Sequence, residues 1–292
     1  MSYHLSPIKR QTPESDFREG GRVEELLLFA SVIAFIYYSI RHHRNRRRLR
    51  LAIDATKALD DMLESYRRGD FQAVLYKSEA LRNGPAKTPA YCFFRGKALY
   101  QLGRLAEAES SLQDARSLEQ DERRVALSTE ALGYALLEQQ RYSDAIACFE
   151  SCIRIWPNRG GGHRAVAEVL LRQGKAGEAV VRARRASAID QNTPALSEEI
   201  HDLNLGEALA IQAWAEAADS GDAAELTRLV VKALRLCGNN KPTQGQVHYY
   251  AGQGYMALGS TARSIEHFEQ AMAADPQGNY GRLARAAAAS AA

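Results

Sequence analysis

The sequence predicts an all-α fold, an α-solenoid of about six helix–turn–helix repeats preceded by a single transmembrane helix. Two observations carry this prediction. A pattern of small and apolar residues returns along the chain at a shift of 34 residues, and a fixed period of that length is typical of stacked repeats. One apolar run near the N-terminus is long enough to be considered as a membrane span.

Composition and charge bound the class of protein. The chain has 292 residues, of which 46% are hydrophobic and 25% charged, as in globular proteins. The net charge of +3 is unevenly distributed, because residues 41–50 carry six arginines and no acid. Residues 51–292 hold 28 basic and 30 acidic side chains, so we expect no nucleic-acid partner. Four cysteines without a C-x-x-C pair indicate no disulfide framework.

Residues 1–22 form a predicted N-terminal tail and residues 23–40 a predicted transmembrane helix. The stretch "LLLFASVIAFIYYSI" (26–40) has no charge, and nine of its fifteen residues are Leu, Ile, Val or Phe. Inserting it into a bilayer gains roughly 3–5 kcal/mol. Eighteen helical residues span about 27 Å, slightly less than a hydrocarbon core of about 30 Å.

Two other interpretations of this run are a cleaved signal peptide and a buried soluble helix. A signal peptide carries its positive charge before the apolar run, whereas here an arginine block follows it. A soluble helix would normally show a polar face, and this one shows none. The positive-inside rule favours a cytoplasmic repeat domain. The basic juxtamembrane segment, residues 41–54, would attract anionic headgroups through Arg41, Arg44, Arg46, Arg47, Arg48 and Arg50.

The repeat domain is predicted over residues 55–278. "LGYALLEQQRYSDAIACFESCIRIWP" (132–157) aligns with residues 166–191 at a shift of 34, and the same frame fits residues 95–120 and 251–276. Two weaker units complete the array. The six units are expected near residues 55–88, 89–122, 126–159, 160–193, 207–240 and 245–278.

The pattern resembles the tetratricopeptide repeat family, whose 34-residue units are helix hairpins. The best match is 126–159, where Gly133 and Ala145 are the small residues at which two helices cross and Phe149 fills the next groove. Pro157 lacks a backbone donor and ends the second helix. The insertion at 194–206 either lengthens a helix or bulges from the stack. Residues 279–292 are expected to form a C-terminal cap and an Ala-rich tail, because terminal repeats need a covering element.

Cys148 and Cys152 raise an alternative, since two thiols four residues apart on a helix could share a metal. Cys152 stands where the family most often has alanine, and cysteine is a small, readily buried hydrophobe. No compatible pair of further ligands lies nearby in the sequence. We therefore interpret both as packing residues, expect no cofactor or metal, and keep a metal or thiol enzyme using Cys148, Cys152 and His163 as a distant alternative.

The resemblance implies a concave groove that binds proteins or peptides. In register with the family, its groove positions are Phe93, Lys97, Tyr100, Gln101, Glu130, Tyr134, Leu137, Glu138, Arg164, Glu168, Leu171, Arg172, Tyr249, Gln253 and Met256. Aromatic and charged side chains on an open face suit a peptide held by a few anchors, although an ordinary solvated face would look the same. The Lys, Arg and Asn carboxylate clamp of some members is not reproduced.

The predicted function is therefore a non-enzymatic, membrane-anchored scaffold that binds partner proteins. The alternative is an envelope-assembly or secretion accessory protein with its repeat domain outside the cytoplasm. The identity of the partner and the oligomeric state do not follow from the sequence, and the passage from fold to function is an analogy.

Overall fold

The computed structural model describes residues 38, 41–44, 46, 56–81, 88–193 and 197–291. It divides the chain into two units, 1–54 and 55–292. In the first unit, the described residues are helical and exposed. The predicted transmembrane helix, residues 23–40, lies outside the described residues apart from Tyr38. Among the helices that the structure does describe, none combines the length and apolarity needed to cross a bilayer.

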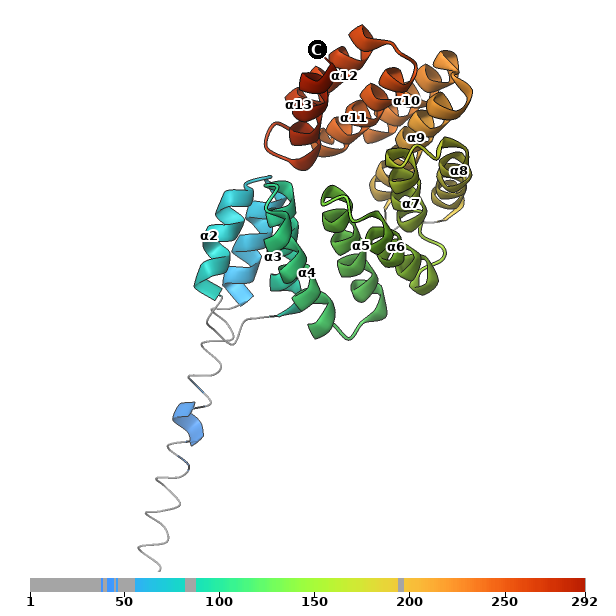
Figure 1. The fold of residues 1–292 in the computed structure, drawn as a ribbon. Helices are drawn as coiled ribbons and strands as arrows, with labels where there is room; N and C mark the ends of the chain where they lie inside the picture. The colour runs from blue at the N-terminus through green and yellow to red at the C-terminus, as the bar shows by residue number, and fades with distance from the viewer. Residues whose placement is uncertain are drawn as a thin grey trace, which may run out of the picture. The chain divides into compact units, whose positions relative to one another are not determined.

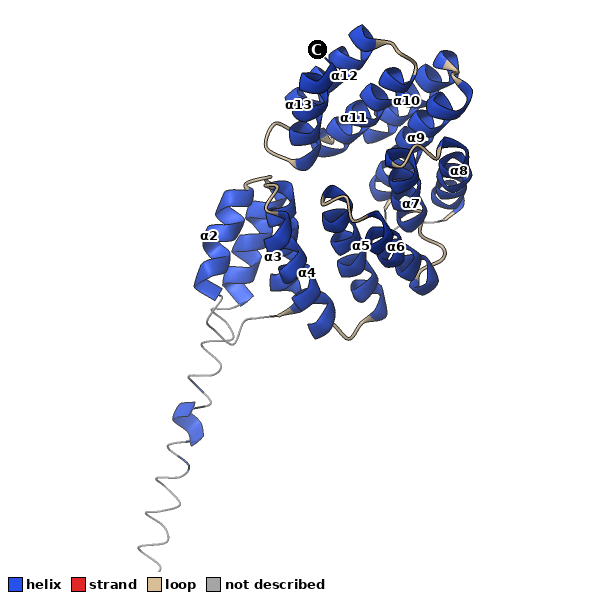
Figure 2. Cartoon of the chain, in the orientation of Figure 1, coloured by secondary structure: helices blue, strands red, loops and turns tan. Residues whose placement is uncertain are grey.

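The described part of the second unit is built from helices and contains no strand (Figure 2), which confirms the predicted fold class. Residues 56–67 are helical and precede the first labelled helix. The further helices are α2 (Phe71–Leu81), α3 (Pro89–Gln101), α4 (Leu105–Leu118), α5 (Glu122–Glu138), α6 (Tyr142–Ile155), α7 (Gly161–Arg172), α8 (Ala176–Asn192), α9 (Glu198–Ser220), α10 (Ala223–Cys237), α11 (Lys241–Ala257), α12 (Thr261–Ala274) and α13 (Asn279–Ala291).

Each hairpin turns at one residue with a positive φ angle. The turn residues are Gly69, Gly103, Gln140, Gly174, Gly221 and Gly259. Glycine adopts this conformation without steric cost, which explains five of the six. Gln140 is the exception, with a φ of 61°. These six residues fix the register of the repeats independently of any helix boundary.

The two helices of a hairpin cross where the first helix carries a small residue seven positions before the turn. A Cβ atom at Gly133 would lie 2.5 Å from a ring carbon of Phe149, and one at Gly252 would lie 2.5 Å from a ring carbon of Phe268. Phe149 and Phe268 are both fully buried. Gly133 therefore lies at the helix crossing, as predicted, but the side chain that packs against it is that of Phe149.

Successive hairpins stack into a curved array that runs from α2 to α13 (Figure 1). The first helix of each hairpin contacts the first helix of the next, as α7 does with α9 and α9 with α11. Residues 198–206 of the insertion form the start of a lengthened helix, because α9 has 23 residues whereas α7 has 12. Helix α13 packs against α12 and α11.

Candidate functional site

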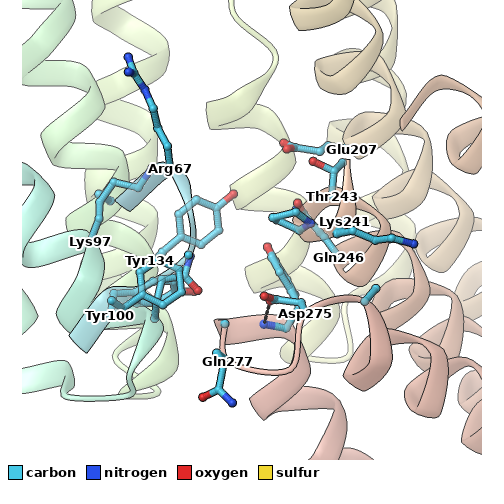
Figure 3. Close-up of a pocket in the computed structure, with 18 of the residues that line it drawn as sticks. Arg67, Lys97, Tyr100, Tyr134, Glu207, Lys241, Thr243, Gln246, Asp275 and Gln277 are labelled. Atoms are coloured by element: carbon cyan, nitrogen blue, oxygen red, sulfur yellow. Dashed lines mark hydrogen bonds between the residues drawn. The ribbon is translucent and has the colours of Figure 1, made fainter. Parts of the chain in front are cut away.

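A cavity of about 670 Å³ lies on the concave side of the second unit. Helices α3 and α5 form one wall, and the N-terminal parts of α9 and α11 form the opposite wall. The segment 274–278, between α12 and α13, lines the cavity as well. Figure 3 shows Lys97, Tyr100 and Tyr134 on one side, with Glu207, Thr243 and Gln246 across from them. A volume of this size is typical of a small-ligand site.

The wall formed by α3 and α5 is aromatic. Phe93, Tyr100 and Tyr134 all line the cavity. The Tyr134 ring packs edge-on against Phe149, with ring centroids 5.1 Å apart, so the hairpin crossing itself positions this tyrosine. Burial raises the pKa of Tyr100 and of Tyr134 well above the ordinary value. Both phenols therefore remain neutral hydroxyls at physiological pH.

Lys97 is the cation of this wall. Its Nζ lies 5.3 Å from the ring centroid of Tyr66 and 5.5 Å from that of Phe93, which is cation–π geometry. Burial lowers its pKa, but the Tyr66 hydroxyl and the carboxylates of Glu130 and Glu207 outweigh that effect and raise the pKa of Lys97 overall. The ammonium therefore stays charged, and it faces the cavity.

The opposite wall presents carboxylates held by arginines. Arg164 donates to Asp190 at 2.8 Å, to Glu207 at 2.7 Å and to the backbone oxygen of Asn204 at 3.1 Å. Burial raises the pKa of Glu207, although Arg164 opposes the shift. On the side of α5, Glu130 forms an ion pair with Arg159. These charged groups are paired with one another, so they contribute more to the structure of the wall than to ligand binding.

The remaining charged residues predicted for the groove form an internal network. Arg172 donates to Glu138 at 2.8 Å and to Glu168 at 2.6 Å. Tyr250 donates its hydroxyl proton to Glu168 at 2.6 Å. Glu168 is only 2% exposed. Here the concave face is filled by the protein's own side chains, which link α5, α7 and α11.

The remaining predicted positions are divided between the core and the surface. Leu137 has no exposed surface, and Leu171 and Tyr249 are also buried in the core. Gln253 is half-buried, and Met256 is 37% exposed. The structure therefore brings together seven of the fifteen predicted residues around the cavity, namely Phe93, Lys97, Tyr100, Gln101, Glu130, Tyr134 and Arg164. Their binding role stays a prediction.

Several lining residues were missed by the sequence interpretation. Arg67 stands one 34-residue repeat before Gln101, so the register could have identified it. Lys241, Thr243 and Gln246 line the cavity from the start of α11, and Asp275 from the turn before α13. These positions do not correspond to groove positions in the repeat pattern. They reach the cavity because the array curves back on itself.

The thiols lie in environments that favour the neutral form. Burial raises the pKa of Cys152 to about 12, and its Sγ–H donates to the backbone oxygen of Ala126 at 3.2 Å. Burial raises the pKa of Cys148 too, and burial lowers the pKa of His163. The thiolate is the nucleophile and the metal ligand, so these positions do not favour the thiol chemistry of the distant alternative. Within the described residues, no group of three or more His, Cys, Asp or Glu is arranged to hold a metal.

Of the predicted juxtamembrane arginines, Arg41, Arg44 and Arg46 are helical and exposed. Arg47, Arg48 and Arg50 lie outside the described residues. The membrane-facing role of this segment therefore stays a prediction.

The comparisons with known proteins agree with the fold. The tetratricopeptide repeat family model matches residues 130–159, which include Glu130, Gly133, Tyr134 and Phe149. No curated protein matches the sequence. The part of the chain that the structure describes is a tetratricopeptide-like α-solenoid.

Solved structures align with the chain at low sequence identity. The structure of the APC/C hetero-tetramer Cut9–Hcn1 aligns with 14% identity and a TM-score of 0.53, over 81% of this chain and 42% of that one. TTC0263, a thermophilic TPR protein from Thermus thermophilus, aligns with 18% identity and a TM-score of 0.48, over 70% and 98% of the two chains. Pseudomonas aeruginosa pilF aligns with 12% identity and a TM-score of 0.46, over 80% and 96%. The chain thus covers less than half of the first of these proteins, and identities this low show the fold alone.

Proposed function

We propose that this protein is a non-enzymatic adaptor that binds a segment of a partner protein in the cavity between α3, α5, α9 and α11. One observation supports this proposal above the others. Lys97 and Tyr134 face a ligand-sized cavity, whereas the arginines and carboxylates elsewhere on the concave face are paired with each other. Aromatic and cationic anchors inside a concave site are the usual carriers of binding energy in protein recognition.

We also propose that residues 23–40 tether this adaptor to a membrane. The support is the uncharged run 26–40 followed by the arginine block, which favours a cytoplasmic repeat domain. The alternative function, in envelope assembly or secretion, requires the opposite topology. A C-terminal reporter that is active in only one compartment separates the two. Activity on the cytoplasmic side supports the adaptor function, and activity on the other side supports the alternative.

Affinity capture from intact membranes tests the binding proposal. We expect the full chain to enrich a reproducible set of proteins, and Tyr134→Ala to lose most of that set, because truncation of a central aromatic anchor commonly costs about 2 kcal/mol or more, about thirtyfold in affinity. Tyr76→Ala is the matched control, since Tyr76 on α2 is 83% exposed and does not line the cavity. Equal loss in both variants, or retention in both, would contradict a role for the cavity.

A further inference from the structure

The C-terminal end of the repeat array is joined to its second hairpin by hydrogen bonds. The backbone N–H of Asn279, at the start of α13, donates to Oε1 of Gln101 at 2.6 Å. Its side-chain Nδ2 donates to the Tyr100 hydroxyl at 2.8 Å. These partners are 178 and 179 residues apart in the sequence, and Asn279 is only 1% exposed. The concave groove is therefore closed into a ring, and the cavity lies inside it.

The segment that makes this closure, residues 275–282, is a preformed turn, and we call it the clasp. The Asp275 carboxylate accepts a hydrogen bond from the backbone N–H of Tyr280 at 3.2 Å. A Cβ atom at Gly281 would collide with the backbone oxygen of Asp275, so the turn is too tight for any other residue there. The clasp combines the turn after α12 with the first residues of α13. Its contacts with α3 are separate from these internal ones, so the seam with α3 is where the ring would open.

The seam is weaker than the interfaces within the array. It consists of Asn279, Gln101 and Tyr100, with Arg282 lying against Gly103. The Nε of Arg282 is buried there without a hydrogen-bond partner in the described structure, which costs free energy. The hairpins, by contrast, are joined by one continuous apolar core that runs through the whole array. The rotation between successive repeats sets the curvature of the array, so a small change in each rotation would separate α13 from α3 while each hairpin stays intact.

Closure also limits what fits inside. An α-helix is about 10–12 Å across with its side chains, so about 670 Å³ holds roughly two turns at most. A helix laid along the groove therefore does not fit in the closed ring. A short extended segment does fit, because it needs only a narrow path between the aromatic wall and the wall of α9 and α11.

We propose that the clasp gates the cavity, so that the closed ring admits a short extended segment of a partner and excludes a helix until the seam opens. This inference rests on the proposed function for its biological meaning. The gating itself is a property of the protein alone and is testable without any partner.

Thiol labelling inside the cavity tests the gate. Asn204→Cys places a reporter at a half-buried position on the α9 wall, in a full chain that also carries Cys148→Ala because the other three cysteines are buried. The probes are one maleimide on a flexible Gly/Ser peptide and one on a helical Glu-Ala-Ala-Ala-Lys peptide. The seam is broken by Gln101→Ala together with Asn279→Ala. The matched control is Gln113→Ala with Asn192→Ala, two amides whose bonds stay within their own helices. Arg285→Cys, at an exposed position on α13, reports the intrinsic rate of each probe.

In the intact ring, we expect the flexible probe to label Asn204→Cys faster than the helical probe. Breaking the seam should raise the rate of the helical probe at least about fivefold and change the flexible probe by less than about twofold, because one hydrogen bond contributes about fivefold to such an equilibrium. The control pair should change neither rate. Equal labelling by both probes in the intact ring, or no response of the helical probe to the broken seam, would overturn the gate. Loss of partner specificity with this labelling pattern intact would overturn the proposed function alone.

Discussion

The two halves of the concave face use the same kinds of side chain in different ways. Between α7 and α11, Arg172, Glu168 and Tyr250 satisfy one another. Arg164 on α7 belongs to this paired half as well, because it holds Asp190 and Glu207 although it also lines the cavity. On the side of α3 and α5, Lys97 and Tyr134 face the cavity. The difference shows that a residue's position in the repeat register does not decide whether it is free to bind. That depends on whether curvature brings a complementary group from another repeat within reach.

The paired half is expected to carry stability and the cavity half to carry binding. Changes in the paired half should therefore lower the free energy of unfolding. Changes in the cavity half should lower partner capture and leave the fold unchanged.

The largest effect is expected for Arg164→Ala. The Arg164 side chain is 8% exposed and bridges Asp190 and Glu207, so its removal leaves two carboxylates without their cation. Removal of one partner from a buried ion pair costs about 3–5 kcal/mol, which urea unfolding followed by circular dichroism would measure.

Arg104→Ala is the control for that measurement. Arg104 pairs with Glu107 at the surface, where both side chains are about half exposed. Exposed pairs contribute little, so the urea midpoint should hardly move. A loss for Arg164→Ala no larger than that for Arg104→Ala would show that the paired half is not a stabilising network.

The hairpin crossings should be equally sensitive in both halves. Gly133→Ala and Gly252→Ala each place a methyl group 2.5 Å from a buried phenylalanine ring carbon, and such overpacking costs about 1–3 kcal/mol. At Gly177, the nearest atom to an added Cβ would be a carboxylate oxygen at 3.3 Å. Gly177→Ala should therefore cost nothing. Equal melting temperatures for Gly133→Ala and Gly177→Ala would contradict the crossing geometry.

Removing one hydroxyl from each half separates the halves most cleanly. Tyr250→Phe takes a hydrogen bond from the buried Glu168 carboxylate, and we expect a loss of about 1–3 kcal/mol in the free energy of unfolding. No hydrogen bond to the Tyr134 hydroxyl lies within the described part of the chain. Tyr134→Phe should therefore fold with unchanged stability and bind its partner more weakly. The reverse pattern would refute the division into a structural half and a binding half.

The last prediction concerns pH and a pair of histidines between α11 and α12. His248 on α11 and His267 on α12 place their Nδ1 atoms 3.1 Å apart. Burial, followed by the charge of His267 and that of Lys241, lowers the pKa of His248 to about 4. Burial lowers the pKa of His267, against the opposing charge of Glu266.

Because the folded state has the lower pKa, the unfolded state binds protons more readily below about pH 6.5. Stability should be complete above that pH and fall as the pH approaches 4. His248→Gln should flatten this part of the stability profile, whereas His201→Gln, which is not part of this pair, should leave it unchanged. If the stability of His248→Gln falls with pH as steeply as that of the wild type, the histidine pair is not the cause of the acid sensitivity.

The fold could be predicted from the sequence because the repeat pattern depends on residues that lie close together in the chain. Small residues at the crossings and glycines at the turns recur at fixed spacings, so Gly133 could be placed at a crossing from its position alone, although Phe149 and not Ala145 meets it there. The site was predictable only in part. Tyr134 and Lys97 follow from the register, but the pairing of Arg172 with Glu138 and Glu168 depends on how far the array curves.

The remaining half of the cavity could not be predicted for the same reason. Asn279 meets Gln101 only because small rotations accumulate over all the repeats, and a pattern with a period of 34 residues contains no information about their sum. The 23-residue length of α9 also follows from an insertion that breaks the period.

Site-specific photocrosslinking tests the central claim most directly. A photoreactive phenylalanine analogue is placed at Tyr134, which lines the cavity, or at Tyr76, which is exposed on α2, in the full chain in its own membranes. The account predicts a discrete crosslinked partner from position 134 and none from position 76. A partner captured from position 76 alone would place recognition on another surface and contradict the account.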